Sequence, residues 1–284
     1  MIRYSQEPER EQRPVGSEPF HRYTFDDGTV WTKFYRIESG YLLRFPDLAD
    51  FEVSADGRSV VGYPAPGTDD VTVEHLYINQ LVPLALSRQG RPAFHASVVT
   101  VPGGAVAFLG KTGMGKSTLA ASFALEESAF LTDDALLIDE TSGVRAMPSH
   151  ASLRLWEDRV EALIPDNTPQ AGAISFSSKA RLLAGEVLHH KDESVPLLAS
   201  YVLDWQDVDE IVIAPLSGST RQMAWISNSF LLDIKDQALL AKHFEWTHRI
   251  AQQVPTFSLD YARDYGMLSK VREAVRRHAL GLGN

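Results

Sequence analysis

Eight consecutive residues, Gly110 to Ser117, have the types and spacing of a phosphate-binding loop. They read Gly-Lys-Thr-Gly-Met-Gly-Lys-Ser and fit the pattern G-x-x-x-x-G-K-[ST]. In such a loop the glycines turn the backbone N–H groups inward, the lysine reaches the β and γ phosphates, and the serine hydroxyl binds Mg²⁺. The sequence therefore predicts a bound nucleoside triphosphate, with Lys116 and Ser117 in these two roles. The predicted nucleotide-binding positions are Gly110, Thr112, Gly113, Met114, Gly115, Lys116, Ser117 and Thr118.

The residues on either side of this loop predict the elements that must hold it. Ala105 to Leu109 is an apolar run typical of a buried strand, and a helix is expected from Ser117 to about Glu126. A helix that starts at the loop would point its first N–H groups at an anion. The loop alone does not decide the reaction, because ATPases, GTPases, kinases and transporters all share it.

Two adjacent carboxylates, Asp133 and Asp134, follow a second short apolar run, Ala129 to Leu131. Proteins with this loop place the carboxylate that holds Mg²⁺ just past such a strand. One of the pair would then serve the metal, and the other would accept a proton from an attacking hydroxyl. The alternative is an aspartate-rich turn between two strands. The phosphate loop favours the catalytic interpretation.

A single histidine, His95, stands before the apolar segment Ser97 to Val99. The turn at Pro102 to Gly104 predicts a hairpin that returns the chain to the level of the phosphate loop. A lone histidine beside a strand is more often structural than catalytic, so the local pattern leaves its role open.

Together these residues resemble the C-terminal kinase domain of HPr serine kinase/phosphorylase. His95 precedes Gly110 by fifteen positions, and Asp133 follows Gly110 by twenty-three. The match covers roughly residues 93 to 140 and is weaker onward to about 275. The resemblance implies that ATP is the phosphate donor and that Asp134 is the general base toward a serine hydroxyl. It also implies that Asp133 supports the metal with Ser117, and that His95 and Lys116 act near the phosphates.

Several shorter segments look like the HPr-kinase-like proteins encoded with ribosomal peptide pathways, which include kinases of lasso-peptide precursors. They are His-Ala-Ser at 95–97, Leu-Arg-Leu-Trp at 153–156 and the stretch Leu259 to Asp264. This resemblance implies that the acceptor is a small protein or a precursor peptide. A metabolite kinase and an ATP-hydrolysing switch without a protein acceptor are the alternatives.

The chain departs from the kinase/phosphorylase family at three places. Lys111-Thr112 stands where the family usually has Asp-Ser, and Ala96 stands where a glycine follows the histidine. No glutamate occurs in Pro148 to Trp156, where the family has a Glu-x-Arg-Gly-type stretch. These differences argue against phosphorylase activity and against HPr as the substrate. The choice between ATP and GTP stays open, and so do the roles of Lys179, Arg181 and Arg263.

The predicted fold class is α/β, with a P-loop kinase core of the HPr kinase/phosphoenolpyruvate carboxykinase type, a mixed sheet and a smaller N-terminal β-rich domain. We expect a flexible tail over residues 1–19, the β-rich domain over 20–90 and the kinase domain over 91–284. Asp-Gly pairs at 27–28 and 56–57 predict hairpins. Helices are predicted at 72–87, 153–164, 227–234, 236–253 and 268–280, and a long connection at 165–188.

Composition excludes several classes of protein. The 284 residues contain no cysteine, so disulfides, thiolate metal sites and cysteine nucleophiles are ruled out. A formal net charge of -10 argues against a general nucleic-acid binder. No apolar run has the length of a signal peptide or a membrane span, which predicts a cytoplasmic location and no membrane partner. Assembly into a homo-oligomer is left open.

Overall fold

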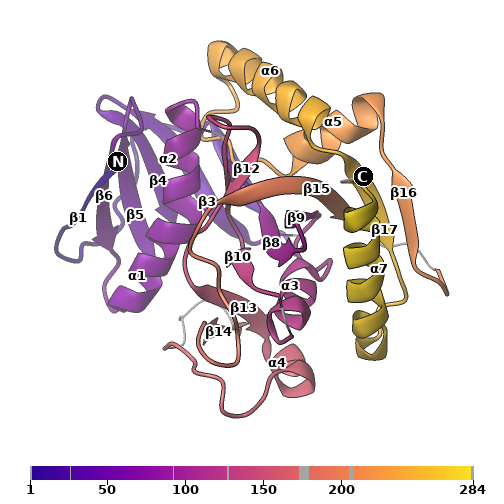
Figure 1. Cartoon of the computed structure of the whole chain (residues 1–284). Coiled ribbons are helices and arrows are strands. Elements are labelled where there is room, and N and C mark those ends of the chain that lie inside the picture. Colours follow the sequence, from indigo (N-terminus) through magenta and orange to yellow (C-terminus); the bar gives the residue numbers. More distant parts are fainter. Residues whose placement is uncertain are drawn as a thin grey trace. The chain divides into compact units, whose positions relative to one another are not determined.

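The computed structural model describes residues 2–25, 27–91, 93–126, 128–172, 179–204 and 208–282. These residues form a mixed α/β structure with two large sheets and one small one (Figure 1). It divides into two compact units. Unit 1 consists of residues up to 91 together with 230–243, and unit 2 holds the rest of the described residues. The sequence predicts that the N-terminal domain consists of residues 20–90, whereas the observed unit 1 also contains residues 230–243.

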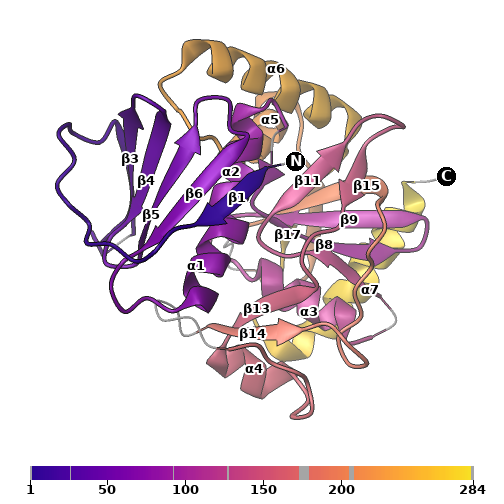
Figure 2. The ribbon, with the colours of Figure 1, turned by 90° about the vertical axis from the view of Figure 1, so that its left-hand side faces the viewer.

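Unit 1 is built on a six-stranded sheet with the order β1-β6-β5-β4-β3-β2 (Figure 2). β1 pairs with β6 in parallel and the other neighbours are antiparallel. The two hairpins predicted from Asp-Gly pairs are present as β2–β3 and β5–β6. The strands are β1 Arg3–Gln6, β2 His21–Thr24, β3 Val30–Ile37, β4 Gly40–Phe45, β5 Ala49–Ser54 and β6 Ser59–Pro64.

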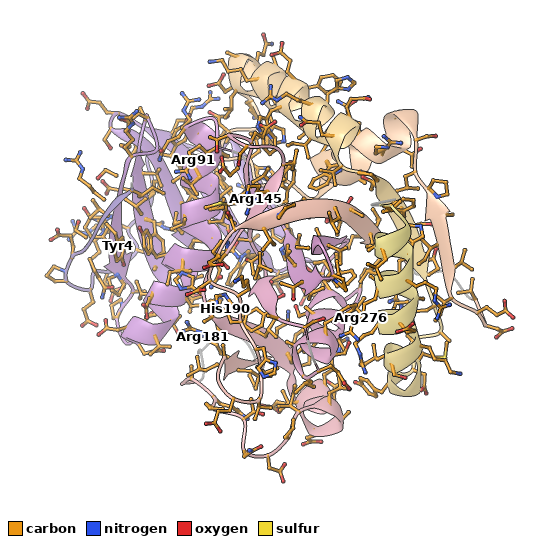
Figure 3. The ribbon with its side chains drawn as sticks, in the orientation of Figure 1. Tyr4, Arg91, Arg145, Arg181, His190 and Arg276 are labelled. Atoms are coloured by element: carbon orange, nitrogen blue, oxygen red, sulfur yellow. The ribbon has the colours of Figure 1, made fainter. Side chains whose placement is uncertain are left out.

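The flexible tail predicted for residues 1–19 is wrong at its start, because Arg3–Gln6 forms strand β1. Tyr4, labelled in Figure 3, stacks on Tyr77 with ring centroids 3.9 Å apart. An edge strand is held by backbone hydrogen bonds, so a polar sequence with one well-placed aromatic ring is enough to form it. Hydrophobic patterning cannot detect such a strand.

A helical segment in three parts packs on this sheet: α1 Asp70–Leu76, the π-helix η1 Tyr77–Leu81 and α2 Val82–Arg88. Its start is capped by Asp69, whose carboxylate accepts a hydrogen bond from the Thr72 N–H at 2.7 Å. The sequence predicts one continuous helix here. Pro83 lacks an N–H and so cannot make the usual helical bond, which accounts for the irregular turn before it. The apolar contacts are made by Val73, Leu76, Leu81, Leu84 and Ala85 against Leu43, Phe45, Phe51, Val53 and Val60.

A buried ion pair links β4 to β5 in unit 1. Arg44 Nη2 lies 2.7 Å from Asp50 Oδ2 and Arg44 Nε lies 2.8 Å from Oδ1, with side chains only 11% and 4% exposed. Removing one partner leaves a buried charge uncompensated, so we expect Asp50→Ala to lower the free energy of unfolding by about 3 kcal/mol. Urea denaturation measures this free energy of unfolding. The matched control Glu38→Ala, in the exposed β3–β4 turn, is expected to change it by less than about 0.5 kcal/mol; equal losses would contradict the assignment.

Unit 2 contains a nine-stranded mixed sheet with the order β10-β8-β9-β15-β12-β11-β7. β17 pairs with the end of β15, and β16 pairs with β17. β9, β15 and β17 run parallel to one another, so their carboxyl ends lie at one edge of the sheet. The strands are β7 Ala93–Phe94, β8 Ala96–Val101, β9 Gly104–Leu109, β10 Phe130–Thr132, β11 Leu136–Asp139, β12 Arg145–Met147, β15 Val195–Leu203, β16 Val212–Pro215 and β17 Thr256–Asp260.

The sheet of unit 2 is buried on both faces, as β9 illustrates. Val106 and Phe108 belong to one apolar cluster, whereas Ala105, Ala107 and Leu109 belong to another. Because side chains alternate along a strand, the two clusters lie on opposite faces. The other elements are α3 Lys116–Ala124, β13 Ser152–Trp156, α4 Glu157–Leu163, β14 Lys179–Leu183, α5 Gly218–Ser227, α6 Gln237–Gln253, η2 Tyr265–Met267 and α7 Leu268–Gly281.

Three sequence predictions in this part of the chain are wrong. The helix predicted at 153–164 is half strand, because β13 precedes α4. Its residues alternate: Leu153 and Leu155 are buried, and Trp156 is exposed. The predicted long connection contains β14, which pairs with β13 in a small sheet (Figure 2), while residues 173–178 lie outside the described residues. The helix predicted at 227–234 instead occupies Gly218–Ser227.

None of the helices in the described residues combines the length and the apolar character needed to cross a bilayer.

Candidate functional site

The loop Gly110 to Ser117 joins β9 to α3 in unit 2, and its three glycines all have positive φ values. Gly110 has φ 141°, and a side-chain carbon placed on it would stand 2.6 Å from the backbone oxygen of Leu203. Gly115 has φ 91° and is the residue before the first turn of α3. Other residues rarely adopt such positive φ values. The loop can therefore bring its backbone close to a ligand at the start of α3.

Lys116 folds back over this loop. Its Nζ donates to the backbone oxygen of Gly110 at 2.6 Å and to that of Lys111 at 3.1 Å. An ammonium group has three donors, so this leaves capacity for an anion at the same place. Burial lowers the pKa of Lys116 to about 8, although the charges of Asp134 and Asp133 oppose the shift. The side chain is thus mostly cationic at neutral pH.

The topology of the sheet brings His95 to the same edge. β8 runs antiparallel to both β9 and β10, so its start lies beside their ends. His95 Nδ1 lies 3.1 Å from the backbone oxygen of Asp134. A carbonyl oxygen only accepts, so we assign the ring proton to Nδ1. Burial, together with the positive charge of Lys116, lowers the pKa of His95 to about 4. The imidazole is therefore neutral at pH 7.

This low pKa gives a direct prediction. We expect the His95 ring to titrate near pH 4 in an NMR pH titration, with its signal identified by loss in His95→Gln. The pKa lies below the ordinary histidine value of 6.5, so the unfolded chain takes up the proton first on acidification. The folded state then loses stability as pH falls from about 6.5 to about 4. A midpoint near 6.5 would contradict the buried, neutral ring.

Asp133 is a buried carboxylate held by donors from three segments. Its Oδ1 accepts from the Ser97 hydroxyl at 2.5 Å, and its Oδ2 accepts from the Arg154 N–H at 3.1 Å. The Ser117 side chain also hydrogen-bonds to it. Burial and the negative charge of Asp134 raise the pKa of Asp133 to about 6. Asp133 therefore connects β8, the phosphate loop and β13.

Asp134 has a different surrounding, although it is the next residue. Its φ of 71° lies in the left-handed region, which aspartate tolerates better than most residues. Asp134 lines a pocket together with His95, Lys116 and Ser117. Asp133 is not among the residues that line this pocket. The two adjacent carboxylates thus differ in position, because Asp134 lies at the pocket and Asp133 does not.

Basic side chains surround Asp134 in this pocket. Its described lining contains four cations: Lys116, Arg154 of β13, Arg159 of α4 and Lys179 of β14. Lys179 Nζ lies 5.2 Å from the ring centre of Trp156, which also lines the pocket. Arg159 and Trp156 were not found from the sequence. The period-two alternation of Leu-Arg-Leu-Trp was the available signal, because it predicts a strand with Arg154 and Trp156 on one face.

The other predicted site residues fall into two groups. Thr112, Gly113 and Gly115 line the pocket, and the Thr118 hydroxyl accepts from Arg159 Nη1 at 3.0 Å. Gly110 and Met114 lie elsewhere: Gly110 lies against the end of β15, and Met114 packs against an apolar cluster. Arg181, whose role the sequence leaves open, donates to the Ser152 hydroxyl at 3.2 Å and is labelled in Figure 3.

The predicted metal ligands are close together, since the Ser117 side chain hydrogen-bonds to the Asp133 carboxylate. The described residues contain no group of three or more His, Asp or Glu side chains that could hold a metal ion. Magnesium at nucleotide sites is usually held by one or two carboxylates together with phosphate oxygens and water. A hydroxyl beside a carboxylate at the phosphate loop fits that donor set.

Comparison with known proteins gives a distant structural similarity. No family model matches the chain, and no curated protein matches it. Among solved structures the chain is similar to the Hpr(Ser) kinase/phosphatase from Coxiella burnetii, with 12% sequence identity and a TM-score of 0.28. The similarity covers 56% of this chain and 97% of the other. At these values the interpretation of the site depends on its own residues.

Proposed function

We propose that this chain is an ATP-dependent phosphotransferase that uses Mg²⁺ and transfers the γ-phosphate to a hydroxyl group. One observation carries the proposal: four cations line a pocket at the phosphate loop around a single carboxylate, Asp134. Placing four cations close together costs free energy, because like charges repel unless anions balance them. Asp134 and the neighbouring Asp133 supply two negative charges against these four positive ones. A polyphosphate would supply the remaining negative charge.

The loop would bind the β and γ phosphates through its backbone N–H groups, the start of α3 and Lys116. Arg154, Arg159 and Lys179 would neutralise charge that develops on the transferred group. Ser117 and Asp133 would hold Mg²⁺, which supplies further charge neutralisation when bound. Phosphoryl transfer requires mainly such positioning and electrostatic stabilisation.

Asp134 is assigned as the general base. Its carboxylate would accept the proton of the acceptor hydroxyl while that oxygen forms a bond to the γ-phosphorus. The bond between the γ-phosphorus and the bridging oxygen to the β-phosphorus breaks, and ADP leaves. Asp133 is less suited to this role, because it does not line the pocket in which the acceptor hydroxyl would meet the γ-phosphate. The neutral His95 positions Asp134 by donating to its backbone oxygen.

The acceptor that we propose is a serine hydroxyl of a small protein or of a lasso-type precursor peptide. The sequence resemblance of Leu153 to Trp156 and Leu259 to Asp264 supports this choice. The pocket supports it as well, because Trp156 is 37% exposed and lies beside Lys179. An exposed aromatic ring next to a cation offers an extended peptide both an apolar and an electrostatic contact.

A transfer assay tests the proposal. The full chain is incubated with Mg²⁺, ATP radiolabelled at the γ-phosphate and a degenerate library of serine-containing peptides. We expect label on peptide serine. Label found only as free phosphate would favour a hydrolysing switch, and label on a compound from a small-molecule extract would favour a metabolite kinase. Either result would contradict the peptide acceptor.

A further inference from the structure

A second group of residues lies at the edge of the unit 2 sheet where three parallel strands end. The strands β9, β15 and β17 end at Leu109, Leu203 and Asp260. The phosphate loop follows β9, and residues 261–263 follow β17. In open α/β sheets ligands bind outside the carboxyl ends of the strands. Residues 261–263 are therefore placed to contact a ligand of the phosphate loop.

Arg263 lies against the loop. A side-chain carbon added at Gly115 would stand 3.9 Å from Arg263 Nη1 and 3.8 Å from the Tyr261 hydroxyl. The guanidinium lies over the Tyr261 ring, 4.2 Å from its centre, and Nη2 donates to the backbone oxygen of Asp204 at 2.6 Å. These contacts hold Arg263 beside the loop residue that precedes Lys116.

One nitrogen of this guanidinium is not used within the described residues. Arg263 Nη1 is buried and has no acceptor in hydrogen-bond geometry there, although the Tyr261 hydroxyl also interacts with the guanidinium. Asp260, three positions earlier, does not accept from Arg263 Nη1, and Asp260 Oδ1 is itself buried without a partner. Buried polar atoms without hydrogen bonds are rare, and each costs free energy. A ligand oxygen beside Gly115 would satisfy this donor.

The position of Arg263 indicates which part of a nucleotide it would contact. It is absent from the lining of the pocket that holds Asp134, so it is not at the acceptor side. Arg263 lies instead beside Gly115, the residue directly before α3. In loops of this type the backbone N–H groups bind the α- and β-phosphates.

We propose that Arg263 binds the α-phosphate of the nucleotide and that Tyr261 positions its guanidinium. This inference rests on the proposed function, in which the loop binds ATP. The α-phosphate is retained in ADP and gains no charge in the transfer. An interaction with it stabilises the ATP and ADP complexes equally, and so sets affinity rather than turnover.

Arg263→Gln tests this with the full chain. By isothermal titration calorimetry, we expect its affinities for ATP and for ADP to fall by the same factor, about tenfold, because one charge-assisted hydrogen bond is lost. The KM for ATP should rise similarly, while kcat at saturating ATP falls less than about threefold. The matched control Arg277→Gln, whose side chain is 76% exposed on α7, should leave both affinities unchanged.

Two results would overturn the assignment. One is unchanged ADP affinity in a folded Arg263→Gln variant; the other is a large loss of kcat with ADP affinity intact, which would place Arg263 at the γ-phosphate. Thermal unfolding checks that Arg263→Gln is folded. If Arg263→Gln is unstable, Arg263→Lys is used in its place. Because lysine keeps the positive charge, we expect Arg263→Lys to lose less affinity for the nucleotides than the factor given for Arg263→Gln. Failure of the wild-type chain to bind ATP would instead overturn the proposed function, and the inference with it.

Discussion

Asp134→Asn is expected to reduce phosphoryl transfer by roughly 10²- to 10⁴-fold, the usual contribution of a general base. The amide cannot take the proton of the acceptor hydroxyl, but it has the size of the carboxylate. Asparagine also tolerates the left-handed backbone of this position, so the fold should persist. ATP affinity should be unchanged or higher, because a negative charge leaves a pocket that binds phosphates. Initial rates and calorimetry measure the two quantities.

Asp133→Asn is the comparison that separates the two carboxylates. Its amide nitrogen would face a donor, since Ser97 and Arg154 both donate to Asp133. We expect this variant to lower the thermal stability of the chain as well as transfer. If Asp134→Asn turned over at the wild-type rate, Asp134 would not be the base. If both variants lost ATP binding equally, the proposed separation of roles would be wrong.

Lys116→Met is expected to weaken ATP binding by at least about tenfold, and transfer by more, because charge-assisted hydrogen bonds to phosphate are lost. Methionine keeps most of the apolar stem, so packing at the start of α3 changes little. The loop itself should become looser, since Lys116 donates to the backbone oxygens of Gly110 and Lys111.

Lys111→Met is the matched control for this prediction. Lys111 lies in the same loop and has the same charge, but its side chain is exposed and is not among the residues that line the pocket. We expect ATP affinity within about threefold of wild type, because exposed charges are screened by solvent. Equal losses in the two lysine variants would show that net charge, rather than the position of Lys116, governs binding.

The centre of the site could be predicted from sequence because its signals are local. The phosphate loop combines a fixed pattern with an apolar strand before it and a helix after it, and the structure places β9 and α3 there. His95 and Asp134 share a pocket with Lys116 because β8 is antiparallel to both of its neighbours. That arrangement is a consequence of short connections between consecutive strands, which the sequence also indicates.

The rest of the site depends on contacts between distant segments. Arg154 and Trp156 reach the pocket because β13 pairs with β14, and such a pairing is not encoded in either segment alone. Arg263 meets Gly115 because β17 joins the sheet beside β15, a long-range parallel pairing. The edge strand β1 is not predicted from the sequence for a related reason: its partner, β6, lies more than fifty positions away along the chain.

The most direct test of the central claim, that the phosphate loop and Asp134 form one phosphoryl-transfer site, is a crystal structure with Mg²⁺ and a non-hydrolysable ATP analogue. The claim predicts β and γ phosphates on the backbone N–H groups of Gly113 to Ser117. It also predicts the Asp134 carboxylate beside the γ-phosphate, with Arg154 and Lys179 around it. A nucleotide bound elsewhere, or bound to the loop with Asp134 turned away from the γ-phosphate, would contradict it.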